Sequence, residues 1–173
     1  DRRYLMVETS RGCPPGCDFC VVPLTHGRKF RSRTARQVVD EIQDGYERYG
    51  VQYYYLWADT VTMNRNFMME FCQELYQRSL PVFWLGNARI DTLNNGEIIT
   101  ELKKSGCWML SVGIEMADDE IRGSISKGFS KDEIQRAIKK LREAGIISFC
   151  FFILGYLNED IATMQSTIDF ALE

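Results

Sequence analysis

The sequence predicts an α/β fold, a partial parallel (β/α) barrel of about five β/α units. Short apolar, β-branched segments recur along the chain, and each precedes a stretch with helical spacing of its apolar residues. The repeat is about 30 residues long, and such alternation produces parallel strands with right-handed crossovers. A chain of 173 residues is too short for the eight units of a closed barrel. A five-stranded doubly wound sheet is the alternative, because strand number is easier to predict than strand order.

The predicted strands and helices alternate in chain order. Strands are expected at residues 4–9, 51–58, 82–87, 107–114 and 146–154. Two helices open with capping boxes, Thr34-x-x-Gln37 and Ser130-x-x-Glu133. Apolar residues at helical spacing indicate three more helices, around residues 67–75, 94–102 and 161–172.

The composition is typical of one globular domain, with 45% hydrophobic and 26% charged residues, so we treat residues 1–173 as a single domain. The net charge of −3 makes nucleic-acid and membrane binding unexpected. No apolar run approaches the ~20 residues of a membrane helix, and the start does not resemble a signal peptide. We therefore expect a cytoplasmic protein. One local basic cluster is expected to be a solvated surface, with anion binding as the alternative; it comprises Arg28, Lys29, Arg31, Arg33 and Arg36.

Three cysteines, Cys13, Cys17 and Cys20, lie within eight residues directly after the first predicted strand. The glycines and prolines around them favour a compact loop that can turn several sulfurs inward. Soft thiolates select zinc or an iron–sulfur cluster, and three ligands leave one metal position open for chemistry. A Cys3His zinc site completed by His26 is the alternative. The three isolated cysteines, Cys72, Cys107 and Cys150, are expected in the core.

The spacing Cys-x3-Cys-x2-Cys, with the aromatic Phe19 before the last cysteine, resembles the signature of the radical S-adenosylmethionine (radical SAM) superfamily. The resemblance implies that Cys13, Cys17 and Cys20 hold a [4Fe–4S] cluster whose fourth iron binds SAM. One electron then cleaves SAM to methionine and a 5′-deoxyadenosyl radical, which abstracts a substrate hydrogen. It also implies an open (β/α)6 barrel, of which residues 1–173 would lack the sixth unit.

Further segments resemble cofactor-binding segments of the same superfamily. Asp59 lies where relatives contact the methionine amino group, although it could instead cap the next helix. Asn87 and Arg89 resemble an Asn-x-Arg segment that contacts the cofactor, and a plain salt bridge from Arg89 to Asp91 is the alternative.

Two later segments complete the predicted SAM site. Glu115 ends a Gly-Ile-Glu segment whose carboxylate approaches the ribose, and Ile153 matches the apolar residue beside the adenine. After Ile153, the Gly-Leu-Pro-Gly-Glu turn of relatives is replaced by a segment without its proline and second glycine, which changes the expected turn. That segment is residues 155–159.

The branch within the superfamily follows from these segments together. The Asn-x-Arg and Gly-Ile-Glu segments and Ser126-Lys127-Gly128 look like the cobalamin-associated branch, with methylthiotransferases as a second resemblance. The cobalamin domain of that branch lies before the radical SAM core, so this chain itself is not expected to bind cobalamin. The resemblance also implies an electron donor similar to flavodoxin or ferredoxin. It does not indicate the final substrate, and a zinc-stabilised binding module remains the alternative function.

Overall fold

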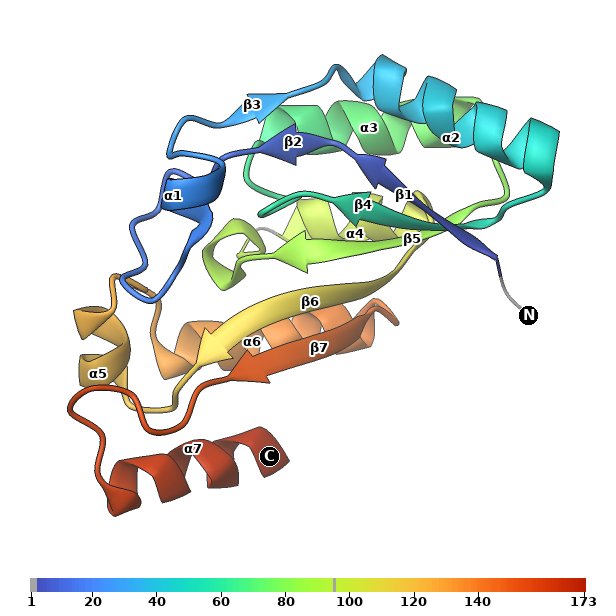
Figure 1. The fold of residues 1–173 in the computed structure, drawn as a ribbon. Coiled ribbons are helices and arrows are strands. Elements are labelled where there is room, and N and C mark those ends of the chain that lie inside the picture. Colours follow the sequence, from blue (N-terminus) through green and yellow to red (C-terminus); the bar gives the residue numbers. More distant parts are fainter. Residues whose placement is uncertain (1–2, 95) are drawn as a thin grey trace.

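A computed structural model describes residues 3–94 and 96–173. Its centre is one parallel sheet in the order β1-β4-β5-β6-β7. Each strand of this sheet therefore pairs with the strand of the same sheet that follows it in the sequence. In Figure 1 all five strands point toward the side where the loop after β1 lies. The strands are β1 Tyr4–Glu8, β4 Tyr53–Trp57, β5 Phe83–Ala88, β6 Cys107–Glu115 and β7 Ile147–Phe152.

This strand order confirms the partial barrel. A doubly wound sheet reverses its winding direction at one strand, which places helices on both faces. Here the order never reverses, so the doubly wound alternative is wrong. The five predicted strands are confirmed, with ends that differ by no more than a few residues. That the chain stops before a sixth unit stays a prediction.

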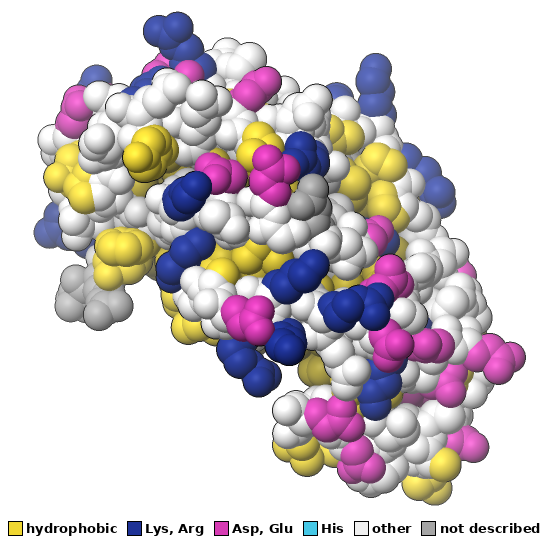
Figure 2. Space-filling model, turned by 180° about the vertical axis from the view of Figure 1, so that it is seen from behind, with side chains coloured by type: hydrophobic (Ala, Val, Ile, Leu, Met, Phe, Trp, Pro, Cys, Tyr) yellow, Lys and Arg dark blue, Asp and Glu magenta, His cyan; other side chains and the backbone are white. Residues whose placement is uncertain are grey.

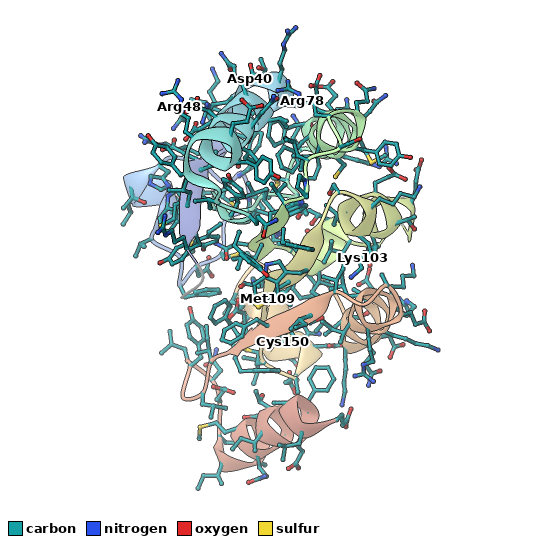
Figure 3. The ribbon with its side chains drawn as sticks, turned by 90° about the vertical axis from the view of Figure 1, so that its right-hand side faces the viewer. Asp40, Arg48, Arg78, Lys103, Met109 and Cys150 are labelled. Atoms are coloured by element: carbon teal, nitrogen blue, oxygen red, sulfur yellow. The ribbon has the colours of Figure 1, made fainter. Side chains whose placement is uncertain are left out.

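The long helices cover one face of the sheet (Figure 1). Both predicted capping boxes are present, at the starts of the helices that follow β1 and β6. Figure 3 shows that Arg78 reaches across to Asp40, where an ion pair of 2.6 Å joins two neighbouring helices. The helices are α2 Ala35–Tyr49, α3 Arg65–Gln77, α4 Gly96–Lys104, α6 Lys131–Glu143 and α7 Ile161–Leu172.

Several short elements were not predicted. Two of them form a small antiparallel pair beside the cysteine loop, β2 Ser10–Arg11 and β3 Arg31–Ser32. Elements of this length show no hydrophobic period, so they depend on tertiary contacts. The others are α1 Val22–Thr25, the 3-10 helix η1 Ile90–Thr92 and α5 Asp119–Ser124.

The two faces of the sheet differ in burial. The face toward the helices carries fully buried residues such as Leu56, Trp84 and Leu110, which pack against α2, α3 and α4. The opposite, concave face exposes Trp57, Phe149 and other large apolar side chains from every strand but β6. None of the helices in the described ranges combines the length and apolar character that a membrane crossing requires.

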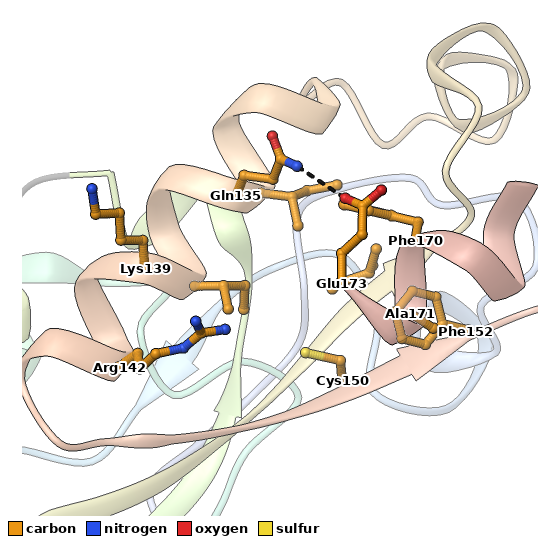
Figure 4. A pocket seen from close by; sticks show the side chains of 11 residues that line it. Gln135, Lys139, Arg142, Cys150, Phe152, Phe170, Ala171 and Glu173 are labelled. Atoms are coloured by element: carbon orange, nitrogen blue, oxygen red, sulfur yellow. Dashed lines mark hydrogen bonds between the residues drawn. The ribbon is translucent and has the colours of Figure 1, made fainter.

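The last helix packs less tightly than the others. Only Thr167 and Phe170 of α7 are buried, and a cavity of about 340 Å³ separates α7 from α6 and β7 (Figure 4). Gln135 donates a hydrogen bond of 3.2 Å to Glu173 across its rim. Cys150 lines this cavity and is half-buried, so its prediction as a core residue is only partly right, whereas Cys72 and Cys107 are fully buried as predicted.

Candidate active site

A pocket of about 350 Å³ lies at the carboxyl ends of the strands. Parallel strands end at one edge of a sheet, so side chains distant in sequence meet there. The pocket gathers residues from the loop after β1 and from the carboxyl-terminal parts of β4, β5, β6 and β7. Eight of the nine predicted site residues line it: Cys13, Cys17, Phe19, Cys20, Asp59, Asn87, Arg89 and Glu115.

The ninth predicted residue, Ile153, is not among those that line the pocket. It packs beside it in a small apolar cluster that includes Met116 and Ile121, and Phe19 packs against the same cluster. The main-chain N–H of Ile153 donates a hydrogen bond of 2.7 Å to the carbonyl of Glu115. Ile153 therefore supports the end of β6, and its predicted place beside an adenine stays a prediction.

The turn after Ile153, residues 155–159, forms although it lacks the second glycine that the resemblance to the superfamily implies. Asn158 adopts a positive φ of 70°, a conformation that asparagine tolerates better than most residues. The N–H of Glu159 donates to the carbonyl of Tyr156 at 3.2 Å, and the Glu159 carboxylate accepts from the N–H of Tyr156 at 2.7 Å. The chain therefore forms a hydrogen-bonded turn without the proline and second glycine of relatives.

Backbone contacts fix the start of the cysteine loop. Gly12 has a φ of +88°, and a Cβ there would lie 2.2 Å from the carbonyl oxygen of Lys29. The N–H of Cys13 donates to the carbonyl of Gly27 at 3.2 Å. Glycine is thus required at position 12 both for its backbone angle and for the close approach of the returning chain.

Asp59 anchors this loop to the end of β4. Its carboxylate accepts a hydrogen bond of 2.8 Å from the N–H of Gly12 and lies 2.8 Å from Nδ1 of His26. The residue that caps α3 is Asn64, whose side chain accepts from the N–H of Phe67. The alternative interpretation of Asp59 as a helix cap is therefore wrong.

Polar groups also surround the cysteine sulfurs. Burial raises the pKa of the Cys13 thiol, and this rise is opposed by a contact of 3.9 Å with the hydroxyl of Thr60 and by the charge of Arg89. Arg89 donates from Nη1 to the sulfur of Cys17 at 3.4 Å. Its Nε and Nη2 each donate to Asp91 at 3.0 Å. The Arg89 guanidinium therefore forms the salt bridge to Asp91 and the contact with Cys17 at the same time.

The end of β6 supplies a buried ion pair that the sequence alone did not indicate. Glu115 and Lys127 contact each other, and each side chain is only 7% exposed. Glu115 has a positive φ of 71° and lies at an irregularity in the pairing of β6 with β7, which turns its carboxylate back toward Gly113. Lys127 also donates to the carbonyl of Gly113 at 3.0 Å. Strained backbone of this kind concentrates at functional sites.

Gly113 leaves space that any side chain would fill. A Cβ at this position would lie 2.2 Å from an oxygen of Glu115 and 2.4 Å from Nζ of Lys127. The pocket thus combines three soft sulfur donors, a glycine cradle and a buried carboxylate. Three cysteine sulfurs at one pocket are the donor set that an iron–sulfur cluster takes, because each thiolate binds a separate iron.

The comparison with known protein families decides the identity. The family described as "Radical SAM superfamily" matches residues 7–171, which is nearly the whole chain. The chain belongs to this superfamily.

Curated relatives of this radical SAM chain include enzymes. An uncharacterised methyltransferase of Pyrococcus horikoshii is 30% identical over 166 residues, which cover 96% of this chain and 36% of the relative. The anaerobic magnesium-protoporphyrin IX monomethyl ester cyclase of Rubrivivax gelatinosus is 31% identical over 172 residues, which cover 99% of this chain and 31% of the cyclase. The chain thus spans about a third of the length of these relatives.

A solved structure shows the same fold. The radical SAM methyltransferase TsrM of Kitasatospora setae, solved with cobalamin and a [4Fe–4S] cluster bound, superposes with a TM-score of 0.87. The match covers 96% of this chain and 34% of TsrM at 18% sequence identity. The match shows that the two chains share a fold, and the place of this chain in the cobalamin-associated branch stays a prediction.

Eight further residues complete the pocket: Val22, Tyr55, Thr60, Ala88, Ser111, Gly113, Lys127 and Phe151. Tyr55 donates its hydroxyl to the side chain of Asn87 at 3.4 Å, and Asn87 donates to the carbonyl of Ala58 at 3.2 Å. Strand alternation could have indicated Tyr55 and Ser111, because both lie on the concave face of the sheet. Lys127 had a signal only as part of the family-like Ser-Lys-Gly segment.

Proposed function

We propose that this chain is the SAM-cleaving core of a radical SAM enzyme. The observation that carries the proposal is the convergence of three cysteines and five polar or aromatic residues, from separate strand ends, on one pocket with a glycine cradle. When bound, the [4Fe–4S] cluster supplies one electron that cleaves SAM to methionine and a 5′-deoxyadenosyl radical. A protein of this class supplies binding, orientation and exclusion of water.

Each residue has a role that follows from its contacts. Cys13, Cys17 and Cys20 would hold the cluster through their sulfurs, which line the pocket. Arg89 donates to the sulfur of Cys17, and a hydrogen bond to a ligand sulfur stabilises its negative charge. Asp59 holds the loop in place through Gly12, so the three sulfurs keep their orientation relative to the strands.

The SAM nucleoside would lie toward the end of β6. The Glu115 carboxylate, held by Lys127, is an acceptor for ribose hydroxyls. The side chain of Asn87 faces the same pocket and supplies a polar contact. Phe19 and Ile153 meet in one apolar cluster, which would support the adenine.

The reaction of the full protein involves more than the cleavage of SAM. The relatives are named as a methyltransferase and a cyclase, so the step that we propose for this chain is the cleavage of SAM that both could share. We propose that cobalamin, where the full protein uses it, is held by a domain outside residues 1–173. The electron would come from a flavodoxin- or ferredoxin-like donor.

Anaerobic reconstitution tests the proposal. We expect about four irons per chain, visible charge-transfer absorption, and 5′-deoxyadenosine when SAM and dithionite are added. Cys17→Ala should abolish the cluster absorption and the product together. Cys150→Ala is the matched control, because this half-buried cysteine lines the cavity between α6 and α7. This variant should retain both the absorption and the product.

Two outcomes would contradict the proposal. Retention of absorption and product by Cys17→Ala would show that the loop does not hold the cluster. One zinc per chain, with intact SAM, would instead support the Cys3His binding module.

A further inference from the structure

Three buried cations of this protein surround one aromatic ring. Figure 2 shows the usual arrangement on the helical side, where Lys and Arg side chains lie at the surface among Asp and Glu side chains. Arg89, Arg122 and Lys127 differ from these cations, because all three are buried. The ring of Phe129, itself only 4% exposed, lies between them. Its centre is 5.9 Å from Cζ of Arg89, 5.8 Å from Cζ of Arg122 and 5.7 Å from Nζ of Lys127.

The ring offers these cations an attraction that an aliphatic side chain could not. Each cation forms an ion pair with a carboxylate, that of Asp91, Asp119 or Glu115. The three positive groups nevertheless repel one another, and the repulsion is strong where water is excluded. The face of an aromatic ring is electron-rich and attracts a cation within about 6 Å of its centre. Phe129 therefore stabilises the close approach of three like charges.

Local and long-range contacts together fix the position of Phe129. The next residue, Ser130, opens the capping box of α6. Nε of Arg122 donates a hydrogen bond of 2.8 Å to the carbonyl of Phe129. Nη1 of Arg122 donates at 2.6 Å to the carbonyl of Met116, just after β6. The ring is thus held between the start of α6 and the end of β6.

Two of the three cations act on different parts of the SAM pocket. Arg89 donates to the sulfur of Cys17 at 3.4 Å, on the side that would hold the cluster. Lys127 pairs with Glu115, on the side that would hold the ribose. Phe129 is not among the residues that line the pocket. Any effect of the ring on the cluster or on SAM must therefore pass through these two cations.

We propose that Phe129 is a positioning residue for both cations of the pocket. It keeps Arg89 directed at Cys17, and it keeps Lys127 directed at Glu115. This inference rests on the proposed function, because it concerns the pocket that would hold the cluster and SAM. A hydrogen bond to a ligand sulfur stabilises the more negative, reduced cluster, so a misdirected Arg89 makes the cluster harder to reduce. A carboxylate that is held less firmly binds ribose hydroxyls less well.

The main test replaces the ring by an aliphatic side chain. Phe129→Leu keeps a buried apolar group but lacks the electron-rich face. In the reconstituted chain at a fixed potential, we expect the ratio of reduced to oxidised cluster to fall about fivefold, measured by electron paramagnetic resonance. SAM affinity, measured by calorimetry, should fall only about twofold. The reason is that Lys127 also lies 5.7 Å from the ring centre of Phe19 and keeps that contact.

Two variants separate positioning from a general loosening of the core. Phe71→Leu is the same substitution at another buried ring, which packs against Phe67 and Trp84. It should lower stability and leave the cluster ratio and SAM affinity unchanged. Phe129→Tyr keeps the ring and should keep both quantities near their wild-type values.

A double variant tests whether the ring acts through Arg89. Arg89→Met removes the donor to Cys17 and should lower the cluster ratio at least as much as Phe129→Leu does. Adding Phe129→Leu to Arg89→Met should lower the ratio no further, because the ring then has no donor to position. In the metal-free chain, denaturant titration of the same single and double variants should show a coupling of about threefold in the unfolding equilibrium constant. This second measurement requires neither cluster nor SAM.

Several results would overturn the inference. One is an unchanged cluster ratio in Phe129→Leu, and another is an equal fall in Phe71→Leu. A further fall in the double variant, or independent effects of the two substitutions in the metal-free chain, would overturn it as well. Failure of the wild type to take up a cluster would count against the proposed function instead. The coupling in the metal-free chain would still show whether Phe129 holds Arg89.

Discussion

The cysteine loop and the end of β6 meet in one pocket, but different forces hold them. The loop depends on single hydrogen bonds to its main chain, such as the one from Gly12 to Asp59, and it remains partly exposed. The end of β6 depends on the buried pair of Glu115 and Lys127 and on a strained backbone at Glu115. A loop held by several weak contacts can adjust to a ligand, whereas a buried ion pair resists displacement because an unpaired charge there is unstable.

The largest effect is expected where one member of the buried pair is removed. Glu115→Ala should lower the free energy of unfolding by about 3–5 kcal/mol, because Lys127 would keep a buried charge without its partner. Denaturant titration measures this loss. The double variant Glu115→Ala/Lys127→Met should regain most of the stability, since both charges are gone, and yet fail to bind SAM. A double variant as unstable as Glu115→Ala would show that the pair is not what stabilises this end of β6.

A smaller effect is expected at the glycine cradle. Gly113→Ala would bring a Cβ against the Glu115 carboxylate and the Lys127 ammonium group, and such overpacking lowers stability by about 1–3 kcal/mol. SAM affinity, measured by calorimetry on the reconstituted protein, should fall as the pocket narrows. Gly123→Ala is the control, because a Cβ at that position would meet nothing within 4 Å, and it should leave SAM affinity unchanged. Equal SAM affinity in both variants would contradict the assignment of the cradle.

Loss of the hydrogen bond that anchors the cysteine loop should change the free energy of unfolding less than it changes the iron content. Asp59→Ala leaves the N–H of Gly12 without its acceptor, which lowers the free energy of unfolding by roughly 1–2 kcal/mol. The iron content after gel filtration should fall further than this loss suggests, because the sulfurs lose their orientation. Asp59→Asn keeps an acceptor oxygen and should retain more iron than Asp59→Ala. Identical iron contents in the two variants would show that the hydrogen bond does not position the loop.

The smallest effect is expected at the turn after β7, which follows Ile153, whose N–H donates to the carbonyl of Glu115. Asn158→Ala should lower the free energy of unfolding by about 1 kcal/mol, because alanine is unfavourable at a φ of 70°. Asn158→Gly, which restores the glycine of relatives, should leave stability nearly unchanged. Thermal unfolding of the two variants measures the difference. Equal unfolding temperatures would show that the positive φ at position 158 does not make alanine less stable than glycine there.

Much of the fold could be predicted because its signals are local. The capping boxes at Thr34 and Ser130 span only three residues each, and the five strands are marked by their own apolar composition. The short pair β2–β3 could not be predicted in this way, because its two strands join segments that lie about twenty residues apart and have no apolar period.

The residues of the candidate site show the same difference between local and long-range signals. The cysteine spacing is local, so Cys13, Cys17 and Cys20 were evident before the structure. The partners of the loop were not, because Gly12 and Asp59 are 47 residues apart and meet only when β1 and β4 pair. The same holds for the role of Asp59, which the sequence left open between a cofactor contact and a helix cap.

The sequence by itself determined the α/β alternation, the cysteine motif and the superfamily, since each rests on neighbouring residues or on their spacing. Only the tertiary structure decided that the strands run in an unreversed order, that Arg89 serves Asp91 and Cys17 together, and that Lys127 neutralises Glu115. The physical reason is that strand order, burial and the pairing of charges depend on which distant segments are brought into contact, and a buried charge finds its partner only once the chain around it has folded.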